Sequence, residues 1–314
     1  MYVHYRCQTV PFDSLELASC WNIHPCLDED TPILQSRSSI TKMGLIYMPF
    51  VVEQQDDSYA VVTGMRAIAA ARRLHNLEEV QCRVLPADTP IETILSCIYE
   101  EYANNKHELT TIGMAHFYAL CNAKLASSEL APFLTGHNIP GKPHHVSRAL
   151  DLLKLESPLQ AGLYEGVLSE SSAREMLRLK ADDRLACYKL FQQLRLGGGK
   201  QRRMLSLLRD LAGRQGCTLA DFIASPAIQE ILEHQEMNTP QKAHFLLQNL
   251  QQLHAPSLAE AEEQFERWKA QLPLGPHCDV EHSTSFEQDK VSLRITFENR
   301  EALEKNLVAI TALL

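Results

Sequence analysis

Four polar side chains stand close together near the start of an expected helix that opens at residues 142–148: His144, His145, Ser147 and Arg148. In the same segment Val146, Leu150 and Leu153 recur at intervals of four and three, which predicts that they face a core and leave the polar residues on other faces. In a helix-turn-helix, residues near the start of the second helix reach base edges in the major groove. An arginine at such a position can donate hydrogen bonds to guanine.

A shorter helix is expected just before this one, over residues 127–134. Ser127 and Ser128 are candidates for its N-cap, because a serine oxygen can accept from the first free N–H groups. A loop with Gly136 and Gly141 follows, and Pro143 suits the first position of the second helix. Residues 127–148 therefore predict a helix-turn-helix, although an ordinary helical hairpin in a bundle is the alternative.

Three further cations, Lys200, Arg202 and Arg203, follow directly after three glycines at 197–199. Positive charges at the start of a helix are disfavoured by the helix dipole. A DNA phosphate would offset this cost. A charge run that is simply solvated is the alternative.

The charge is distributed unevenly along the chain. The net charge of the 314 residues is −9, which argues against a protein that coats nucleic acid. Residues 103–215 hold 16 Lys and Arg against 10 Asp and Glu, whereas residues 1–102 hold 7 against 14 and residues 216–314 hold 7 against 15. A basic middle between two acidic ends predicts that any contact with a polyanion lies in the middle.

Several functional classes find no support in the residues. The nine cysteines include no CxxC pair, and the nearest approach to a metal motif is Cys20, His24 and Cys26. We therefore interpret the cysteines as free thiols in a reducing cytoplasm and not as metal ligands. There is no HExxH, no Walker loop and no Ser-His-Asp order. No run of about 18 apolar residues and no signal peptide is present, so we expect a cytoplasmic protein without a membrane span.

The pattern of breakers and periodicities predicts the elements that would position these residues. Up to about Leu85 the signals are mixed: a helix that stops at Gly44, strands at 50–53 and 59–62, a helix at 65–74 and a strand at 80–84. Helices dominate from 91 to 253. A helix at 257–272, a strand at 290–297 and a helix at 301–314 complete the chain.

This order of segments resembles the ParB family. The resemblance rests on segments at 44–46, 49–52, 59–71 and 77–84, which are similar to the ParB/sulfiredoxin-type N-terminal domain, and on 107–110, 146–155 and 168–174 farther on. It implies an α+β N-terminal ParB/sulfiredoxin-like domain at 1–100 and an all-α helix-turn-helix middle at 101–254. It also implies a small α+β C-terminal dimerisation module at 255–314, laid out as helix, strand and helix.

ParB proteins bind CTP at a turn with the pattern (A/T)GERRxRAA and close as a clamp on DNA. There a glycine lets backbone N–H groups approach phosphate, and arginines donate to it. In this chain Gly64 and Arg66 match that turn. Met65, Ala67 and Ala69 replace its glutamate and two of its arginines. The resemblance therefore implies weak CTP binding through Gly64 and Arg66 at most; a role only in shaping the turn is the alternative.

The family also places a Glu-Asn pair at the next helix to hold Mg²⁺. Here the aligned residues are Tyr102 and Ala103, and a shift by one residue would bring Glu101 there without an adjacent Asn. The missing pair and the altered turn count against CTP hydrolysis, so we expect no catalytic residue and no metal.

These observations lead us to expect a ParB-like protein that binds double-stranded DNA in chromosome or plasmid partition or in related DNA-linked regulation. We expect a homodimer held by the C-terminal module, since two half-sites raise affinity for a palindrome. The family implies a ParA-type ATPase as a further partner. The alternatives are a nucleotide-dependent enzyme, either a CTP hydrolase or a nuclease, and a scaffold whose acidic ends bind another protein.

Overall fold

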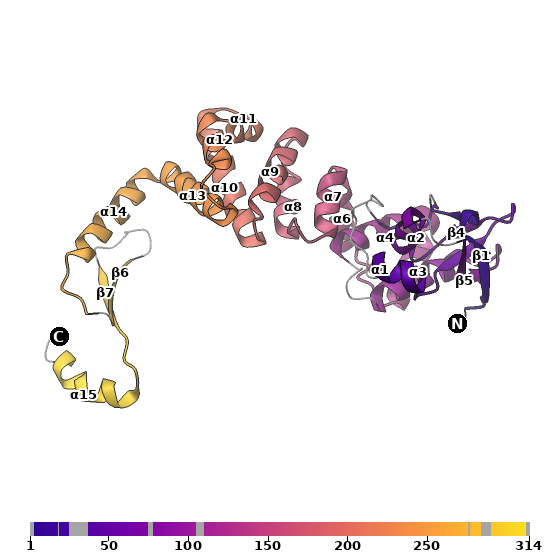
Figure 1. Cartoon of the computed structure of the whole chain (residues 1–314), viewed down its shortest axis with the longest axis horizontal. Coiled ribbons are helices and arrows are strands. Elements are labelled where there is room, and N and C mark those ends of the chain that lie inside the picture. Colours follow the sequence, from indigo (N-terminus) through magenta and orange to yellow (C-terminus); the bar gives the residue numbers. More distant parts are fainter. Residues whose placement is uncertain are drawn as a thin grey trace. The chain divides into compact units, whose positions relative to one another are not determined.

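The computed structural model describes residues 3–17, 19–24, 37–74, 78–104, 110–275, 277–283 and 290–311. The chain divides into two compact units, 1–205 and 206–314, and the boundary falls inside the long helix α10 (Gly198–Gln215). Along the sequence, strands and helices mix first, helices alone follow, and a hairpin and a last helix complete the order (Figure 1). The mixed helix-and-strand class predicted from the sequence is confirmed, whereas the boundaries at 100 and 254 stay predictions.

The first unit opens with a five-stranded mixed sheet in the order β1-β5-β3-β4-β2. Its strands are β1 (Arg6–Pro11), β2 (Leu15–Glu16), β3 (Phe50–Glu53), β4 (Tyr59–Val61) and β5 (Glu79–Leu85). β5 pairs antiparallel with β1 and parallel with β3, while β4 pairs antiparallel with β3 and parallel with β2. Two helices belong to the same region, α1 (Arg37–Met43) and α2 (Met65–Leu74).

The predicted elements of this region are found, to within a residue at the strand ends. α1 ends where Gly44 adopts a left-handed φ of +70° and donates its N–H to the Ile40 carbonyl, as the glycine predicts. β1 and β2 were not predicted. β1 ends in Pro11, which tolerates only an edge position, and β1 is an edge strand. β2 has two residues, too few to show a periodicity.

Helices form the rest of the first unit. They are α3 (Ile91–Asn104), α4 (Thr111–Lys124), α5 (Ser127–Gly136), α6 (Pro143–Leu150), the short 3₁₀ helix η2 (Asp151–Lys154), α7 (Ser157–Tyr164), α8 (Glu170–Met176) and α9 (Ala181–Leu194). α4 lies at their centre, in contact with α3, α5, α6, α7 and η2. Its N-cap is Thr110, whose hydroxyl accepts the Gly113 N–H at 3.2 Å.

The N-cap predicted for α5 is wrong. Neither Ser127 nor Ser128 caps the helix, because the N-cap position is Ala126, which has no side-chain acceptor. Instead, Glu129 in the first turn reaches back, and its Oε2 accepts the Ala126 N–H at 2.8 Å. The carboxylate closes one half of a capping box and also suits the positive end of the helix dipole.

The core face predicted for α6 is wrong in part. Val146 is buried as predicted, but Ala149 and Leu152 are the other buried residues, and Leu150 and Leu153 are only half-buried. The reason is that α6 ends at Leu150 and continues as η2. A 3₁₀ helix has three residues per turn, so the buried position in η2 is Leu152, three residues after Ala149, and not Leu153.

The second unit continues from α10 with helices and a hairpin. Its elements are α11 (Leu219–Ile223), α12 (Pro226–Glu233), α13 (Thr239–His254), α14 (Pro256–Ala270), β6 (Cys278–His282), β7 (Val291–Ile295) and α15 (Arg300–Thr311). β6 and β7 pair antiparallel. β6 is an addition to the expected helix-strand-helix order. Only Val280 in it is buried, so its sequence carries little apolar alternation.

None of the helices in the described part of the chain combines the length and the apolar character that crossing a membrane requires.

Phe117 offers a test of the central position of α4. Its ring is fully buried, with centroids 5.6 Å from Tyr99 and 6.5 Å from Phe133. Phe117→Ala should lower the free energy of unfolding by about 3–5 kcal/mol, because it leaves a cavity among helices that cannot close fully. Urea denaturation followed by circular dichroism measures this. The control Asn122→Ala, at an exposed site on the same helix, should stay within about 0.5 kcal/mol of the wild type. Equal effects of the two substitutions would contradict the packing.

Candidate nucleic-acid interface

α6 exposes the four polar side chains that the sequence analysis assigns to DNA contact. The exposed residues are His144, His145, Ser147 and Arg148. The two imidazole rings lie 4.1 Å apart between centroids, and Pro143 occupies the first helical position as predicted. The helix thus presents imidazole, hydroxyl and guanidinium groups together, and such groups can hydrogen-bond to base edges and phosphates.

The C-terminal end of α6 is fixed by a chain of hydrogen bonds from two neighbouring helices. Arg174 of α8 donates from Nη1 to the Arg148 carbonyl at 2.8 Å and from Nε to Glu170 Oε1 at 2.8 Å. The Thr111 hydroxyl at the start of α4 donates to Glu170 Oε2 at 2.9 Å. Burial acts to raise the pKa of Glu170, but its hydrogen bonds from Arg174 and Thr111 outweigh this and lower the pKa. The ionised carboxylate therefore holds Arg174 against the end of α6.

The three cations predicted near Gly197–Gly199 lie in the first two turns of α10. Lys200, Arg202 and Arg203 are all exposed, and no acidic residue stands in the first turn to balance them. The start of α10 lies so close to α8 that a Cβ on Gly198 would come within 2.9 Å of the Ser169 Cβ. Positive charge is thus concentrated at the positive end of a long helix.

Gln201 directs these cations outward, and the sequence analysis did not identify it. Its side chain is 1% exposed and makes three hydrogen bonds. Oε1 accepts the Ser169 N–H at 3.0 Å, and Nε2 donates to the carbonyls of Val167 and Leu196 at 2.7 Å. The sequence shows only an uncharged amide residue between Lys200 and Arg202, which does not indicate this role.

Gly64 and Arg66 occupy the turn expected from the resemblance, but Arg66 turns inward. Gly64 has a left-handed φ of +73° just before α2. Arg66 is 9% exposed and donates from Nη1 to the Tyr164 hydroxyl at 2.5 Å. Its guanidinium carbon lies 4.5 Å from the centroid of the same ring, which adds a cation–π contact. Arg66 therefore joins α2 to α7.

A histidine lies beside this buried guanidinium. His24 is 5% exposed, and its Nε2 lies 2.8 Å from the Tyr102 hydroxyl. Its ring meets the Tyr164 ring edge-on, with centroids 5.6 Å apart. Nδ1 of His24 and the Nε and Nη2 atoms of Arg66 are buried without a hydrogen-bond partner in the described structure. Burial lowers the pKa of His24 to about 3, assisted by the charges of Arg66 and His116, so the ring is neutral.

The other residues considered for phosphate or metal serve structural contacts. Tyr102 is in the core, and Glu101 pairs with Arg83 at 2.6 Å. Arg72, an arginine farther along α2, also makes a structural contact, because it donates to the Leu15 carbonyl at 2.8 Å. Among the described residues no group of three or more His, Cys, Asp or Glu could hold a metal ion, and Cys26 lies outside them. CTP binding through Gly64 and Arg66 stays a prediction, and it would require the buried guanidinium of Arg66 to become accessible.

No family model and no curated protein matches the chain. Two solved structures of the chromosome-partitioning protein ParB from Caulobacter crescentus, both C-terminally truncated, are similar to parts of it. The structure with CTP-γ-S is 19% identical and covers 59% of this chain and 98% of its own, with a TM-score of 0.23. The structure with the centromeric parS site is 21% identical and covers 58% and 89%, again with a TM-score of 0.23.

The buried His24 predicts a pH dependence of stability. In the unfolded chain its pKa is near 6.5, so the unfolded state takes up the proton first as the pH falls. The stability that depends on neutral His24 is therefore present above pH 6.5 and is lost between pH 6.5 and about 3. Between pH 6.5 and about 5 the loss should be about 1.5 kcal/mol, measured by urea denaturation.

His24→Gln should reduce this slope, because glutamine does not titrate; burial also lowers the pKa of His116, which accounts for the part of the slope that remains. His244→Gln, a substitution at an exposed histidine, is the matched control and should leave the slope in place. An unchanged slope in His24→Gln would show that His24 does not cause the pH dependence.

Proposed function

We propose that this chain binds double-stranded DNA through α6 and the start of α10, as a ParB-like partition or DNA-linked regulatory protein. The observation that carries the proposal is the exposed polar face of α6. Its opposite face is buried through Val146 and Ala149, and its C-terminal end is fixed by Arg174. A short helix held this firmly can present side chains to base edges in a major groove.

The charge of the middle of the chain supports the same proposal. The basic surplus lies in residues 103–215, which include α6 and α10. Lys200, Arg202 and Arg203 carry a charge that the dipole of α10 disfavours, and contact with DNA phosphates would relieve this. These cations would bind the backbone without regard to sequence, whereas Arg148 and its neighbours on α6 would read bases.

We further propose that the protein acts as a homodimer through its C-terminal elements. β7 is covered on one edge by β6. Apolar side chains of β7 and α15 remain exposed, with Leu293 at 59%, and Val291 and Leu303 are also exposed. A second copy that covers this surface would bury the apolar area and protect the strand edge. Two copies would also place two α6 helices on a palindromic site.

A nucleotide-dependent enzyme is the second candidate. Only one observation favours it: the Nε and Nη2 atoms of Arg66 have no hydrogen-bond partner in the described structure. These two donors form the edge of the guanidinium that can bind two oxygens of one phosphate group through parallel hydrogen bonds. The bond to Tyr164 and the apolar residues Ala67 and Ala69 count against it. The resemblance to ParB also suggests a ParA-type ATPase as a partner, for which the acidic ends would be available.

Charge reversal at the start of α10 tests the DNA contact. The triple variant Lys200→Glu, Arg202→Glu and Arg203→Glu should weaken binding to every duplex sequence. It should also reduce the slope of log affinity against log salt by about 0.9 for each phosphate that the variant no longer neutralises. Fluorescence anisotropy with labelled duplex DNA at several salt concentrations measures both the affinity and the slope.

The control carries the same change of net charge elsewhere. The exposed residues Arg6, Lys42 and Arg267, which lie outside β7 and α15, are replaced by glutamate together. The control should keep the salt slope of the wild type. If affinity and slope fall equally in both variants, net charge and not the start of α10 determines binding.

Deletion of residues 277–314 tests the dimer. Without β6, β7 and α15 the protein should be a monomer in multi-angle light scattering, because the exposed apolar side chains of β7 and α15 are gone. The double variant Leu293→Asp and Leu303→Asp should give the same result with the full chain. A dimer that survives both changes would contradict an interface at these elements.

A further inference from the structure

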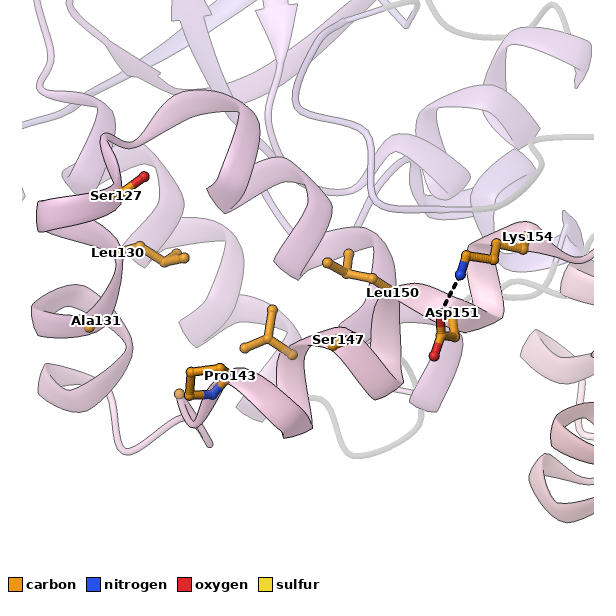
Figure 2. A pocket seen from close by; sticks show the side chains of 10 residues that line it. Ser127, Leu130, Ala131, Pro143, Ser147, Leu150, Asp151 and Lys154 are labelled. Atoms are coloured by element: carbon orange, nitrogen blue, oxygen red, sulfur yellow. Dashed lines mark hydrogen bonds and ion pairs between the residues drawn. The ribbon is translucent and has the colours of Figure 1, made fainter.

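A pocket of about 540 Å³ opens between α5 and α6 (Figure 2). Its wall on α5 is formed by Leu130 and Ala131, and its wall on α6 by Pro143, Val146 and Leu150. Leu150, which the sequence pattern places in the core, turns its side chain to this pocket. A volume between about 300 and 1,000 Å³ with mostly apolar walls is typical of small-molecule sites.

The polar groups of the pocket are few. Ser127 and Ser147 lie at its walls, and Asp151 and Lys154 lie near the C-terminal end of α6. The Lys154 Nζ donates to Asp151 Oδ1 at 2.6 Å, so the two charges compensate each other. The hydroxyl groups of Ser127 and Ser147 can each donate and accept a hydrogen bond. The pocket therefore offers apolar walls with neutral hydrogen-bonding groups and no net charge.

We propose that the α5–α6 pocket binds an uncharged, mainly apolar small molecule that carries a carbonyl, hydroxyl or amide group. Lys154 and Asp151 already pair with each other, so an ionic ligand would have to break this pair and gains little. The apolar body packs against Leu130, Pro143 and Leu150, and the polar group bonds to Ser127 or Ser147. Each of these contacts is made by residues of the first unit alone.

The position of the pocket gives the ligand a role. Ser147 forms part of the pocket wall, and His144 and Arg148 are exposed on the same helix. An occupied pocket adds contacts between α5 and α6 and stands beside the side chains that the proposed function places on DNA. Ligand and DNA then change each other's affinity by the same factor. This coupling rests on the proposed function, whereas the ligand site does not.

The test uses the full chain and the neutral naphthalene ketone prodan, whose emission shifts to the blue in apolar surroundings. We expect saturable binding by the wild type. Ala131→Trp fills the pocket from the α5 wall and should weaken binding at least tenfold. Ser147→Trp fills it from the α6 wall and should do the same. Ser128→Trp, an exposed site on α5 that does not line the pocket, should bind prodan like the wild type.

Two results would overturn the site: no saturable binding by the wild type, or equal affinity of Ala131→Trp, Ser147→Trp and Ser128→Trp for prodan. Tighter binding of the anionic anilinonaphthalene sulfonate than of prodan at this site would overturn the assignment of an uncharged ligand. Titration of duplex DNA with and without prodan separates the two proposals. Prodan binding that Ala131→Trp blocks, in a protein without DNA affinity, would refute the proposed function and leave the ligand site standing.

Discussion

The burial of α4 on nearly every side is the constraint on which the first unit depends. Most of its apolar residues, such as Phe117, are buried, and α3, α5, α6, α7 and η2 all pack against it. Removing so much apolar surface from water is the main favourable contribution to folding. Because α6 is anchored to α4 through Val146 and Ala149, its remaining faces are left for polar residues. The proposed DNA contact is thus a consequence of how the core is packed.

A second constraint is the buried charge of Arg66. A guanidinium inside a protein is costly unless hydrogen bonds and neighbouring π-systems compensate it. Tyr164 supplies both, and the neutral state of His24 avoids a second positive charge. These contacts join α2 near the sheet to α7 among the helices. A residue that the family resemblance assigns to phosphate therefore also serves cohesion within the first unit.

The sequence predicts local features well and long-range ones poorly. Gly44 marks the end of α1 because a left-handed residue is needed there, and Pro143 marks the start of α6. The direction of Arg66 depends on Tyr164, which lies 98 residues farther along the chain. Likewise, Gln201 is buried only because α8 and α10 meet. The spacing of apolar residues near Arg66 and Gln201 does not indicate these contacts, so neither the direction of Arg66 nor the burial of Gln201 could be predicted from the sequence.

Hydrogen exchange followed by mass spectrometry tests the central claim most directly, because it locates a DNA contact along the chain without any substitution. The full chain is compared with and without a duplex of roughly two helical turns, about 20 base pairs. We predict slower exchange in α6 and in the first turns of α10, with little change in α2. Exchange in α6 that DNA leaves unchanged, while another segment becomes protected, would contradict the account.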